Sequence, residues 1–469
     1  MQFSRFIFIL IDGAPYSVFH ELIENNELPN IKRFITNQGC LKKAVSVFPS
    51  TTGPAFIPFF MGLFPGTANV PGYRWLSKKD ILQHKYGRPG LCSYQGADGL
   101  NFLVDLPDQP TLFNYFSPVS NIYNLLTKGC SPVDDRTRRK KPLAYAAAHF
   151  FHKIWQHITA VASQELIKAV EEGDQFISCL FSAVDGHSHF SHTKSKAVIK
   201  SYKSVDQTIG KVCQSLYRSG DLDKTMILIS SDHGMTNTKT HIDIARCLDR
   251  SGHRCLHYPL IWRRNVKSAS MVSGNGMANL YFKANAVDWG ERMSFEEIDR
   301  RGVVDFLLEF EGLGLIAGQS EDGSIIVRNR LGKGQVSAVN GTISYKFDGV
   351  DPLGYNTCYH NLSSREALIE TYDTKYPDGL VQISQIFRSS RAGDLVLSAE
   401  PGYDLRARYE YPEHRATHGG LIAGQMLIPL AVNFPIETEF IRSVDIFPTV
   451  LNQFGHQVEG FEIDGQIVK

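Results

Sequence analysis

The sequence has no apolar run long enough to cross a membrane, which takes about 18 to 20 residues. Residues 54–64 are apolar but too few, and histidines and a lysine interrupt the longer stretch at residues 143–163. We therefore expect no membrane span. The apolar run at residues 6–11 is also too short for a secretory signal and leads directly into Asp12, so we expect a cytoplasmic protein.

The sequence also lacks an excess of charge of either sign. Lysine and arginine total 49 and aspartate and glutamate total 48, which gives a formal net charge of +1. A protein that binds nucleic acid through its general charge has a basic excess, so this class is disfavoured. The hydrophobic share of 43% excludes a mainly disordered chain. The basic run at residues 136–141 is interpreted as a solvated loop, with a phosphate-facing role as the less favoured alternative.

No two cysteines are spaced as a CxxC pair, and the eight that are present are scattered along the chain. In a chain of this size such cysteines are typical of reduced thiols and not of a disulfide framework. They give no support for a zinc site built from cysteine.

What the sequence does contain is an alternation of buried strands and helices. Continuous apolar runs at residues 6–11, 176–184, 225–231 and 394–398 predict strands that are covered on both faces, as in parallel sheets. Helical spacing between them predicts an α/β fold around a parallel sheet. Residues 270–347 read instead as short strands and glycine turns, so we predict a β-rich insertion there, with residues 1–269 and 348–469 forming the core.

Three of the predicted strands lead into an aspartate: Asp12, Asp185 and Asp232. In open α/β sheets, ligands bind at the carboxyl ends of the strands. These carboxylates could therefore converge on one cation site. Taken singly, each aspartate is more simply a turn residue or a helix cap.

Histidines and a threonine pair accompany these aspartates. His189 follows Asp185 by four residues, so one helical turn could present both to a metal ion. His233 directly follows its aspartate, and His418 lies in a glycine-flanked loop. Thr51 and Thr52 precede a predicted helix at residues 55–64, whose positive end favours an alkoxide and a phosphate; a helix cap is the simpler alternative. Carboxylate, imidazole and hydroxyl ligands suit zinc, and also manganese or iron, but not calcium.

The order of these residues resembles the alkaline phosphatase superfamily, most closely its nucleotide pyrophosphatase/type I phosphodiesterase branch. The resemblance runs from Asp12 to His418 and includes residues 442–449. It implies a three-layer sandwich around a mainly parallel sheet, with two divalent metal ions, zinc by preference, at the carboxyl edge. One ion would be held by Asp185, His189 and His418, and the other by Asp12, Asp232, His233 and the nucleophilic threonine.

In this family the nucleophile stands three residues after a proline. Pro49 assigns that position to Thr52, with Thr51 as the alternative. The resemblance implies hydrolysis of a small phosphorylated substrate, such as a nucleotide or a phosphodiester, through a threonyl-phosphate intermediate. The alternatives are a phosphomonoesterase or phosphonate hydrolase with the same metals, or a catalytically silent relative that binds a phosphorylated ligand.

The sequence departs from the family pattern in two places. Ala55 stands where this branch usually has an asparagine that contacts a phosphoryl oxygen, and the histidine that often follows the glycine-rich stretch at residues 62–66 is absent. The first departure weakens the diesterase hypothesis. The second concerns a residue that does not bind metal.

Several further residues are weighed as site residues, each against a simpler alternative. His187 is a minor candidate for a metal ligand. Arg415 is a candidate for holding a substrate oxygen, although an ordinary salt bridge is simpler. Residues 73–75, Tyr-Arg-Trp, are a candidate substrate platform, with packing as the simpler role for both aromatic rings.

Overall fold

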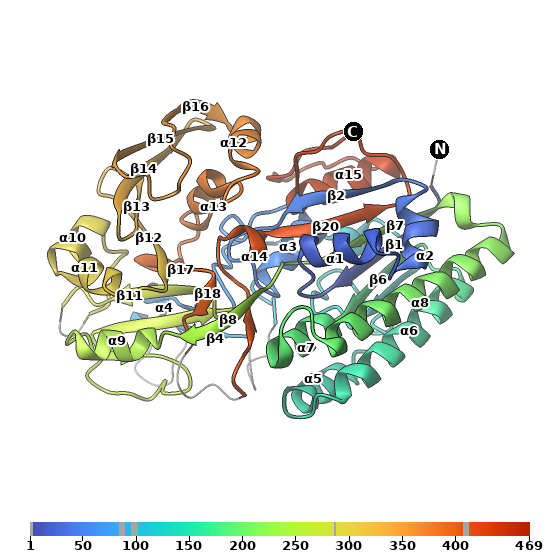
Figure 1. Ribbon diagram of the computed structural model, residues 1–469, viewed down its shortest axis with the longest axis horizontal. Helices are drawn as coiled ribbons and strands as arrows, with labels where there is room; N and C mark the ends of the chain where they lie inside the picture. The colour runs from blue at the N-terminus through green and yellow to red at the C-terminus, as the bar shows by residue number, and fades with distance from the viewer. Residues whose placement is uncertain (1–2, 84–89, 95–101, 286–287, 407–411) are drawn as a thin grey trace.

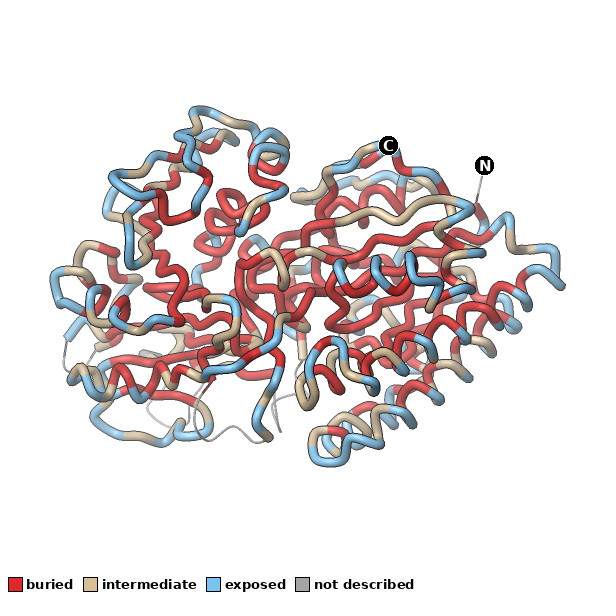
Figure 2. The backbone as a smooth tube through the Cα atoms, in the orientation of Figure 1, coloured by how far each residue is buried: buried red, intermediate tan, exposed pale blue. Residues whose placement is uncertain are grey.

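Two β-sheets organise the chain, one in each half of the molecule as Figure 1 shows it. The computed structural model describes residues 3–83, 90–94, 102–285, 288–406 and 412–469. Buried residues make up most of both sheets, and exposed residues lie mainly on the outer helices and hairpins (Figure 2).

The first sheet has seven strands. In spatial order they are β21 (Ile441–Arg442), β2 (Cys40–Val45), β20 (Leu427–Val432), β7 (Thr225–Ser230), β1 (Arg5–Ile11), β6 (Phe176–Phe181) and β5 (Val119–Ile122). Strands β7, β1, β6 and β5 are parallel neighbours, whereas β20 runs antiparallel to β7 and β2. The predicted α/β fold with a mainly parallel sheet is confirmed.

Helices cover both faces of this sheet, which explains the continuous apolar runs of its central strands. Every residue of β6 and β7 is buried. Helices α5 (Lys141–Phe150), α6 (Ile154–Glu172), α7 (Ala183–Ser191) and α8 (Lys196–Ser219) lie on one side, and α3 (Ile57–Met61) and α15 (Ile446–Gln453) on the other (Figure 1). On the latter side, the ring of Phe8 packs 5.3 Å from Phe59 and 5.7 Å from Phe60 between centroids. This arrangement is the expected three-layer sandwich.

Shorter helices adjoin strands of the first sheet along the chain. They are α1 (Tyr16–Glu24), α2 (Pro29–Ile31), which continues as a π-helical turn at Lys32–Thr36, and α14 (Ala423–Met426). Among the helices of the described ranges, none has both the length and the apolar character that crossing a bilayer requires.

The second sheet has nine strands and is largely antiparallel. Its order is β16 (Tyr359–Ser363), β15 (Thr342–Gly349), β14 (Gly332–Val339), β13 (Ile325–Arg328), β12 (Leu313–Gln319), β17 (Leu395–Ala399), β11 (Met277–Phe282), β10 (Ser268–Ser273) and β9 (Cys255–Leu256). The predicted insertion at residues 270–347 supplies most strands of this sheet, whereas β9 and β16 at its edges and β17, between β12 and β11, come from outside it. The division of the chain into domains at those boundaries stays a prediction.

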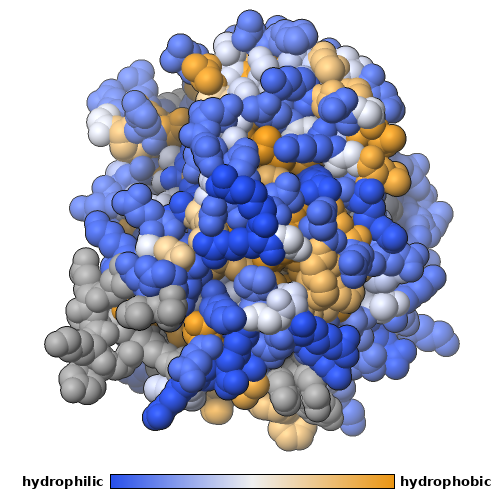
Figure 3. Space-filling model, turned by 90° about the vertical axis from the view of Figure 1, so that its left-hand side faces the viewer, coloured by the Kyte–Doolittle hydropathy of each residue, from blue (hydrophilic) through white to orange (hydrophobic). Residues whose placement is uncertain are grey.

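Helices and a short hairpin pack around the second sheet. They are α4 (Lys78–Gln83), α9 (Ile244–Arg250), α10 (Phe295–Arg300), α11 (Val303–Leu308), α12 (Ser364–Thr371), α13 (Gly379–Ile386) and the hairpin of β3 (Arg74–Leu76) with β4 (Leu91–Ser93). The outer face of this half is mostly hydrophilic and carries only small groups of apolar side chains (Figure 3).

The structure differs from the predicted elements in three places. The strand predicted at residues 176–184 ends at Phe181, so Asp185 lies in the first turn of α7 and not at a strand end. The strand predicted at residues 394–398 is β17, which belongs to the second sheet. The helix predicted at residues 55–64 is a 3-10 turn at Pro54–Phe56 followed by α3, because Gly62, with φ of 66°, ends the helix in a left-handed conformation.

A small third sheet joins the two halves. Strand β8 (Thr236–His241), which follows β7 of the first sheet, pairs with β18 (Gly402–Asp404) on one side and β19 (Ala416–Thr417) on the other. This sheet fixes the loop that follows β19 beside the carboxyl ends of β1 and β7. His418 begins that loop.

Candidate active site

Three carboxylates converge at the carboxyl edge of the first sheet. Asp12 follows β1 and Asp232 follows β7, while Asp185 is brought beside them by α7. The backbone amide of Asp185 donates a hydrogen bond of 3.0 Å to the carbonyl oxygen of Asp12. The amide of Gly13 lies 3.3 Å from Asp232 Oδ1. The backbone therefore holds all three aspartates in one cluster, as the sequence predicts.

In each of three histidines, a hydrogen bond from Nδ1 to a backbone carbonyl oxygen orients the ring toward these carboxylates. His189 Nδ1 lies 2.9 Å from the carbonyl oxygen of Ala416. His233 Nδ1 lies 3.0 Å from the carbonyl oxygen of Gly234, and His418 Nδ1 lies 3.2 Å from that of Ser50. A carbonyl oxygen only accepts, so each Nδ1 carries the proton and donates. In a neutral imidazole this tautomer leaves the lone pair on Nε2, the atom through which such a ring binds a metal.

The Nε2 atoms face the carboxylate oxygens at close range. Asp185 Oδ1 lies 3.3 Å from His189 Nε2 and 3.8 Å from His418 Nε2. His233 Nε2 lies 3.3 Å from Asp232 Oδ2 and 3.6 Å from Asp12 Oδ1. All six predicted acidic and imidazole residues are thus brought together.

The cluster contains two groups of three residues whose ligand atoms lie within 4.8 Å of one another. The first is Asp185, His233 and His418, and the second is Asp12, Asp232 and His233. The second matches three of the four ligands predicted for one ion. The first contains His233 in place of the predicted His189, because the ring of His233 stacks on that of His418 at 3.8 Å between centroids. His189 borders this group, with its ring 5.2 Å from that of His418.

The donor set fits divalent cations. Two buried oxygens, Asp185 Oδ1 and Asp232 Oδ2, accept no hydrogen bond from any residue in the described ranges. Burial, together with repulsion from neighbouring carboxylates, raises the pKa of Asp12 well above its usual value, and burial also raises the pKa of Asp232. Burial and the nearby His233 lower the pKa of His418 well below its usual value. Buried acceptors that lack donors, beside the neutral imidazole of His418, are suited to a cation that replaces the missing hydrogen bonds.

Thr52 places its hydroxyl at the second group. Its Oγ1 lies 3.1 Å from His233 Nε2 and 3.4 Å from Asp12 Oδ1. Thr51 is buried, and its hydroxyl makes no hydrogen bond to the cluster among the residues that the structure describes. Of the two threonines, Thr52 is therefore the one whose hydroxyl contacts the cluster.

A fourth imidazole, His414, lies beside the cluster and was missed by the sequence analysis. Its ring centroid is 4.2 Å from that of His189, and its Nδ1 lies 3.2 Å from Asn275 Nδ2. Burial, together with the nearby His189, lowers its pKa well below the usual value, so the ring is neutral. The spacing of four residues between His414 and His418 was the available signal, since Asp185 and His189 have the same spacing.

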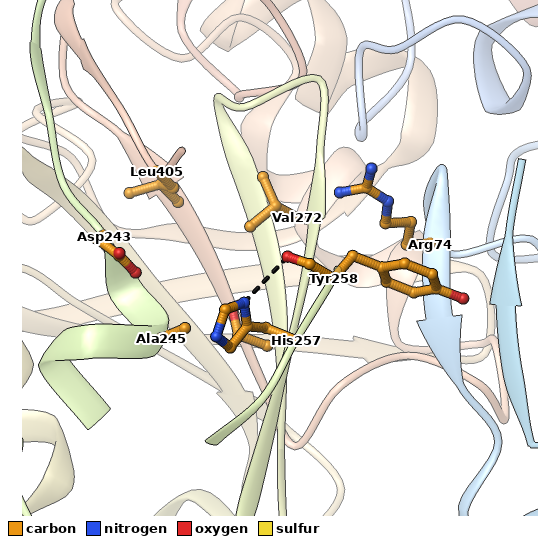
Figure 4. Close-up of a pocket in the computed structure, with 8 residues that line it drawn as sticks. Arg74, Asp243, Ala245, His257, Tyr258, Val272 and Leu405 are labelled. Atoms are coloured by element: carbon orange, nitrogen blue, oxygen red, sulfur yellow. Dashed lines mark hydrogen bonds between the residues drawn. The ribbon is translucent and has the colours of Figure 1, made fainter. Parts of the chain in front are cut away.

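The side chains of the candidate substrate platform at residues 73–75 contact other residues of the same chain. The Tyr73 hydroxyl donates to the Tyr94 carbonyl oxygen at 2.9 Å, and Trp75 is buried. The Arg74 guanidinium lies 4.9 Å from the ring centroid of Tyr258 and lines a water-sized cavity of about 10 Å³ (Figure 4). The two aromatic side chains thus pack within the protein, as in the simpler of the two roles considered for them.

The remaining candidates lie around the site. His187 is on the far side of α7 and lines a surface groove with His152 and Phe190, away from both groups of ligands. Arg415 is exposed, and its carbonyl oxygen is close to His192 Nδ1, at 3.2 Å. Ala55, at the position of the family asparagine, is fully buried and offers no side-chain donor.

Comparison with known proteins agrees with this geometry. A family model described as type I phosphodiesterase/nucleotide pyrophosphatase matches residues 6–421. No curated protein sequence matches the chain.

Solved structures share the fold over almost the whole chain. Phosphonoacetate hydrolase from Sinorhizobium meliloti 1021, in complex with phosphonoacetate, is 15% identical with a TM-score of 0.58, and the match covers 95% of this chain and 94% of that one. An inactive variant of murine ectonucleotide pyrophosphatase/phosphodiesterase 5, in complex with AMP, is 12% identical with a TM-score of 0.58, and covers 98% and 97%. From the match over residues 6–421 and the shared fold, we conclude that the chain belongs to the type I phosphodiesterase/nucleotide pyrophosphatase family of hydrolases, within the alkaline phosphatase superfamily.

Proposed function

We propose that this protein is a two-metal phosphodiesterase or nucleotide pyrophosphatase that uses Thr52 as its nucleophile. The observation that carries the proposal is the position of Thr52 Oγ1, 3.1 Å from His233 Nε2, beside a buried cluster of three carboxylates and three imidazoles. No other arrangement of titratable groups in the described residues combines a nucleophile with two candidate cation sites.

The proposed ligands are those predicted from the sequence. Asp185, His189 and His418 would hold one ion, and Asp12, Asp232, His233 and Thr52 the other, with His233 close enough to contribute to both. Zinc suits this mixture of oxygen and imidazole nitrogen best, and manganese or iron would also fit. Bound divalent ions supply Lewis acidity that lowers the pKa of a hydroxyl and neutralises charge on phosphoryl oxygens.

The chain's own residues position the reaction. Asp12 and His233 fix the Thr52 hydroxyl by contacts of 3.4 and 3.1 Å, which orients its oxygen for in-line attack on phosphorus. The bond from Thr52 Oγ1 to phosphorus forms as the bond to the leaving oxygen breaks, and the proton that the Thr52 hydroxyl loses ends on the leaving alcohol or phosphate. Water then hydrolyses the threonyl phosphate and regenerates the hydroxyl.

A phosphonate hydrolase with the same site is the second candidate. The buried Ala55 cannot donate to a phosphoryl oxygen, which removes one feature expected of a diesterase. A relative of the same fold is known in complex with phosphonoacetate, and another, an inactive variant, in complex with AMP. Comparing turnover of p-nitrophenyl thymidine monophosphate, p-nitrophenyl phosphate and phosphonoacetate distinguishes the candidates, and we expect the first to be preferred.

The nucleophile is tested by Thr52→Ala. We expect turnover to fall by about a thousandfold or more, because the attacking oxygen is gone, while the metal content of the purified protein stays close to two ions per chain. Thr51→Ala is the matched control and should retain most of the activity. Wild-type turnover in Thr52→Ala, or a larger loss in the control, would refute the assignment, and a metal-free wild-type protein would refute the two-metal proposal.

A further inference from the structure

Helix α5 carries an unpartnered apolar stripe on its outer face. Leu143, Ala146 and Phe150 are spaced by three and four residues, so they lie on one side of the helix. All three are exposed, with 77% of Leu143 and 64% of Phe150 accessible, and Phe151 directly after the helix is 65% accessible. The tube of α5 is correspondingly among the exposed parts of the outline in Figure 2. We call these four residues, with the cations described next, the α5 surface.

Both ends of the stripe carry positive charge. Arg138, Arg139 and Lys140 are exposed immediately before the helix, and Lys153 is exposed three residues after it. Helix α5 has no acidic residue in its first turn, although its N-terminus has a positive partial charge. The cations at this end add to that positive charge, and together they favour the binding of an anion there.

Most of these cations lack an acidic partner within the protein. Lys140 lies 3.2 Å from Glu165, and the neighbouring Lys141 is buried against Asp135 at 2.7 Å. No carboxylate of a described residue forms a salt bridge with Arg138, Arg139 or Lys153. Three of the four cations of the α5 surface are therefore without a salt bridge to any described residue, although the chain as a whole is nearly neutral.

The apolar surface continues onto the helix that carries two of the proposed ligands. A groove of about 340 Å³ beside the end of α5 is lined by His152, Lys153, Gln156, His187 and Phe190. The His152 and Phe190 rings are 3.7 Å apart between centroids. Phe190 is a residue of α7, next to His189, so the α5 surface lies one helix away from the candidate active site.

We propose that the α5 surface docks the protein on an anionic lipid bilayer. An apolar stripe with two phenylalanines, flanked by arginine and lysine, is the arrangement of helices that lie in the plane of a membrane interface. The apolar side chains enter the acyl boundary while the cations remain at the level of the phosphate headgroups. An interface with another protein would bury the apolar stripe equally well, but it would not by itself explain unpaired cations at both ends. The proposal goes beyond the hydrolase function and does not depend on it.

The test is co-sedimentation of the full-length protein with vesicles of mixed phosphatidylcholine and phosphatidylserine. We expect binding to these vesicles, at least tenfold weaker binding to pure phosphatidylcholine, and loss of binding at high salt. The Phe150→Ser/Phe151→Ser variant removes the apolar contact and the Arg138→Gln/Arg139→Gln variant removes the charge, and each should weaken binding at least tenfold. The replaced side chains are exposed, so folding should be unaffected.

Two controls keep the result specific. Tyr217 and Trp262 are each 74% accessible and lie outside the α5 surface, so the Tyr217→Ser/Trp262→Ser variant should bind like wild type. All variants should hydrolyse a soluble p-nitrophenyl ester at the wild-type rate. A loss of vesicle binding with unchanged hydrolysis then tests membrane docking independently of the proposed nucleophile. Equal binding to both kinds of vesicle, or α5 variants that bind like wild type, would overturn it. So would sedimentation equilibrium showing a wild-type dimer that the phenylalanine variant dissociates.

Discussion

At the scale of single residues, the candidate site depends on the protonation of its histidine rings and carboxyl groups. Each of the three histidines gives its Nδ1 proton to a backbone carbonyl, so the ring can present only Nε2 to a cation. The carboxylates have fewer hydrogen-bond donors around them than they have acceptor oxygens. Asp12 and Asp232 are both buried and their pKa values are raised, so the metal-free protein holds acid groups that resist ionisation.

Asp12→Asn should stabilise the metal-free protein while abolishing one ion site. Burial, followed by repulsion from Asp232 and Asp185, raises the pKa of Asp12, so the folded state binds this proton more tightly than the unfolded chain. Its contribution to stability is therefore lost as the pH rises above about 4, the value in the unfolded chain. At neutral pH we expect the variant to gain about 1–3 kcal/mol in free energy of unfolding after chelation.

Urea unfolding of the chelated wild type and variant, at pH 5 and pH 7.5, measures this effect. The difference between the two proteins should grow with pH. Asp206→Asn is the control, because Asp206 is also buried but accepts hydrogen bonds from Asn30 Nδ2 and from the amide of Ile31, and its loss should destabilise the protein. A destabilised Asp12→Asn would contradict the assignment of an uncompensated acid.

At the scale of elements, the position of His418 depends on a turn of the second half of the chain. Gly274 has φ of 59°, and a Cβ there would lie 2.6 Å from His418 Nδ1. The next two residues hold the same loop, since the amide of Gly276 donates to the His418 carbonyl oxygen at 2.7 Å. The turn between β10 and β11 therefore supports His418, one of the proposed metal ligands.

Gly274→Ala should thus impair metal binding as well as stability. A methyl group at this position pushes the His418 ring away from Asp185, and we expect turnover to fall by at least tenfold together with the metal content. Gly349→Ala is the matched control, because Gly349 has φ of 70° and no atom within 4 Å of an added Cβ. Both variants should lose about 1 kcal/mol through backbone strain, but only the first should lose metal. Equal metal content in the two would show that the turn does not position His418.

The elements also show what the sequence can reveal and what it cannot. The sequence could place Asp12 and Asp232 at one edge because each lies within two residues of the end of a buried parallel strand. The strand at residues 394–398 has the same apolar character but joins the second sheet, since a buried run does not specify which sheet covers it. His414 was missed because its approach to His189 depends on the path of a loop, and no local pattern determines such a path.

At the scale of the whole molecule, a buried ion pair joins the two halves. Arg442, at the edge of the first sheet, donates to both oxygens of Asp378, at distances of 2.6 and 2.7 Å, and to the carbonyl oxygen of Ser364 at 2.5 Å. Asp378 directly precedes α13, which packs beneath the second sheet. Both side chains are buried, so neither is satisfied by water if the other is removed.

Arg442→Gln should therefore destabilise the protein by about 3–5 kcal/mol, the usual cost of leaving a buried charge without its partner. Arg365→Gln is a suitable control. Arg365 is partly exposed and its nearest carboxylate oxygen, on Asp445, is 3.8 Å away, so the loss should stay below about 1 kcal/mol. Thermal unfolding measures both variants, and a similar shift in the two would contradict a special role for the Arg442–Asp378 pair.

The small sheet of β8, β18 and β19 has a consequence for biosynthesis. It holds His418 beside a cluster whose first residue in the sequence is Asp12. Most of the chain is therefore synthesised between these two residues. A nascent chain can display the early aspartates and the Ser-Asp-His-Gly sequence well before the last imidazole leaves the ribosome. In the proposed two-metal enzyme, the ligand set is therefore complete only late in synthesis, and a chain that ends before this loop lacks His418.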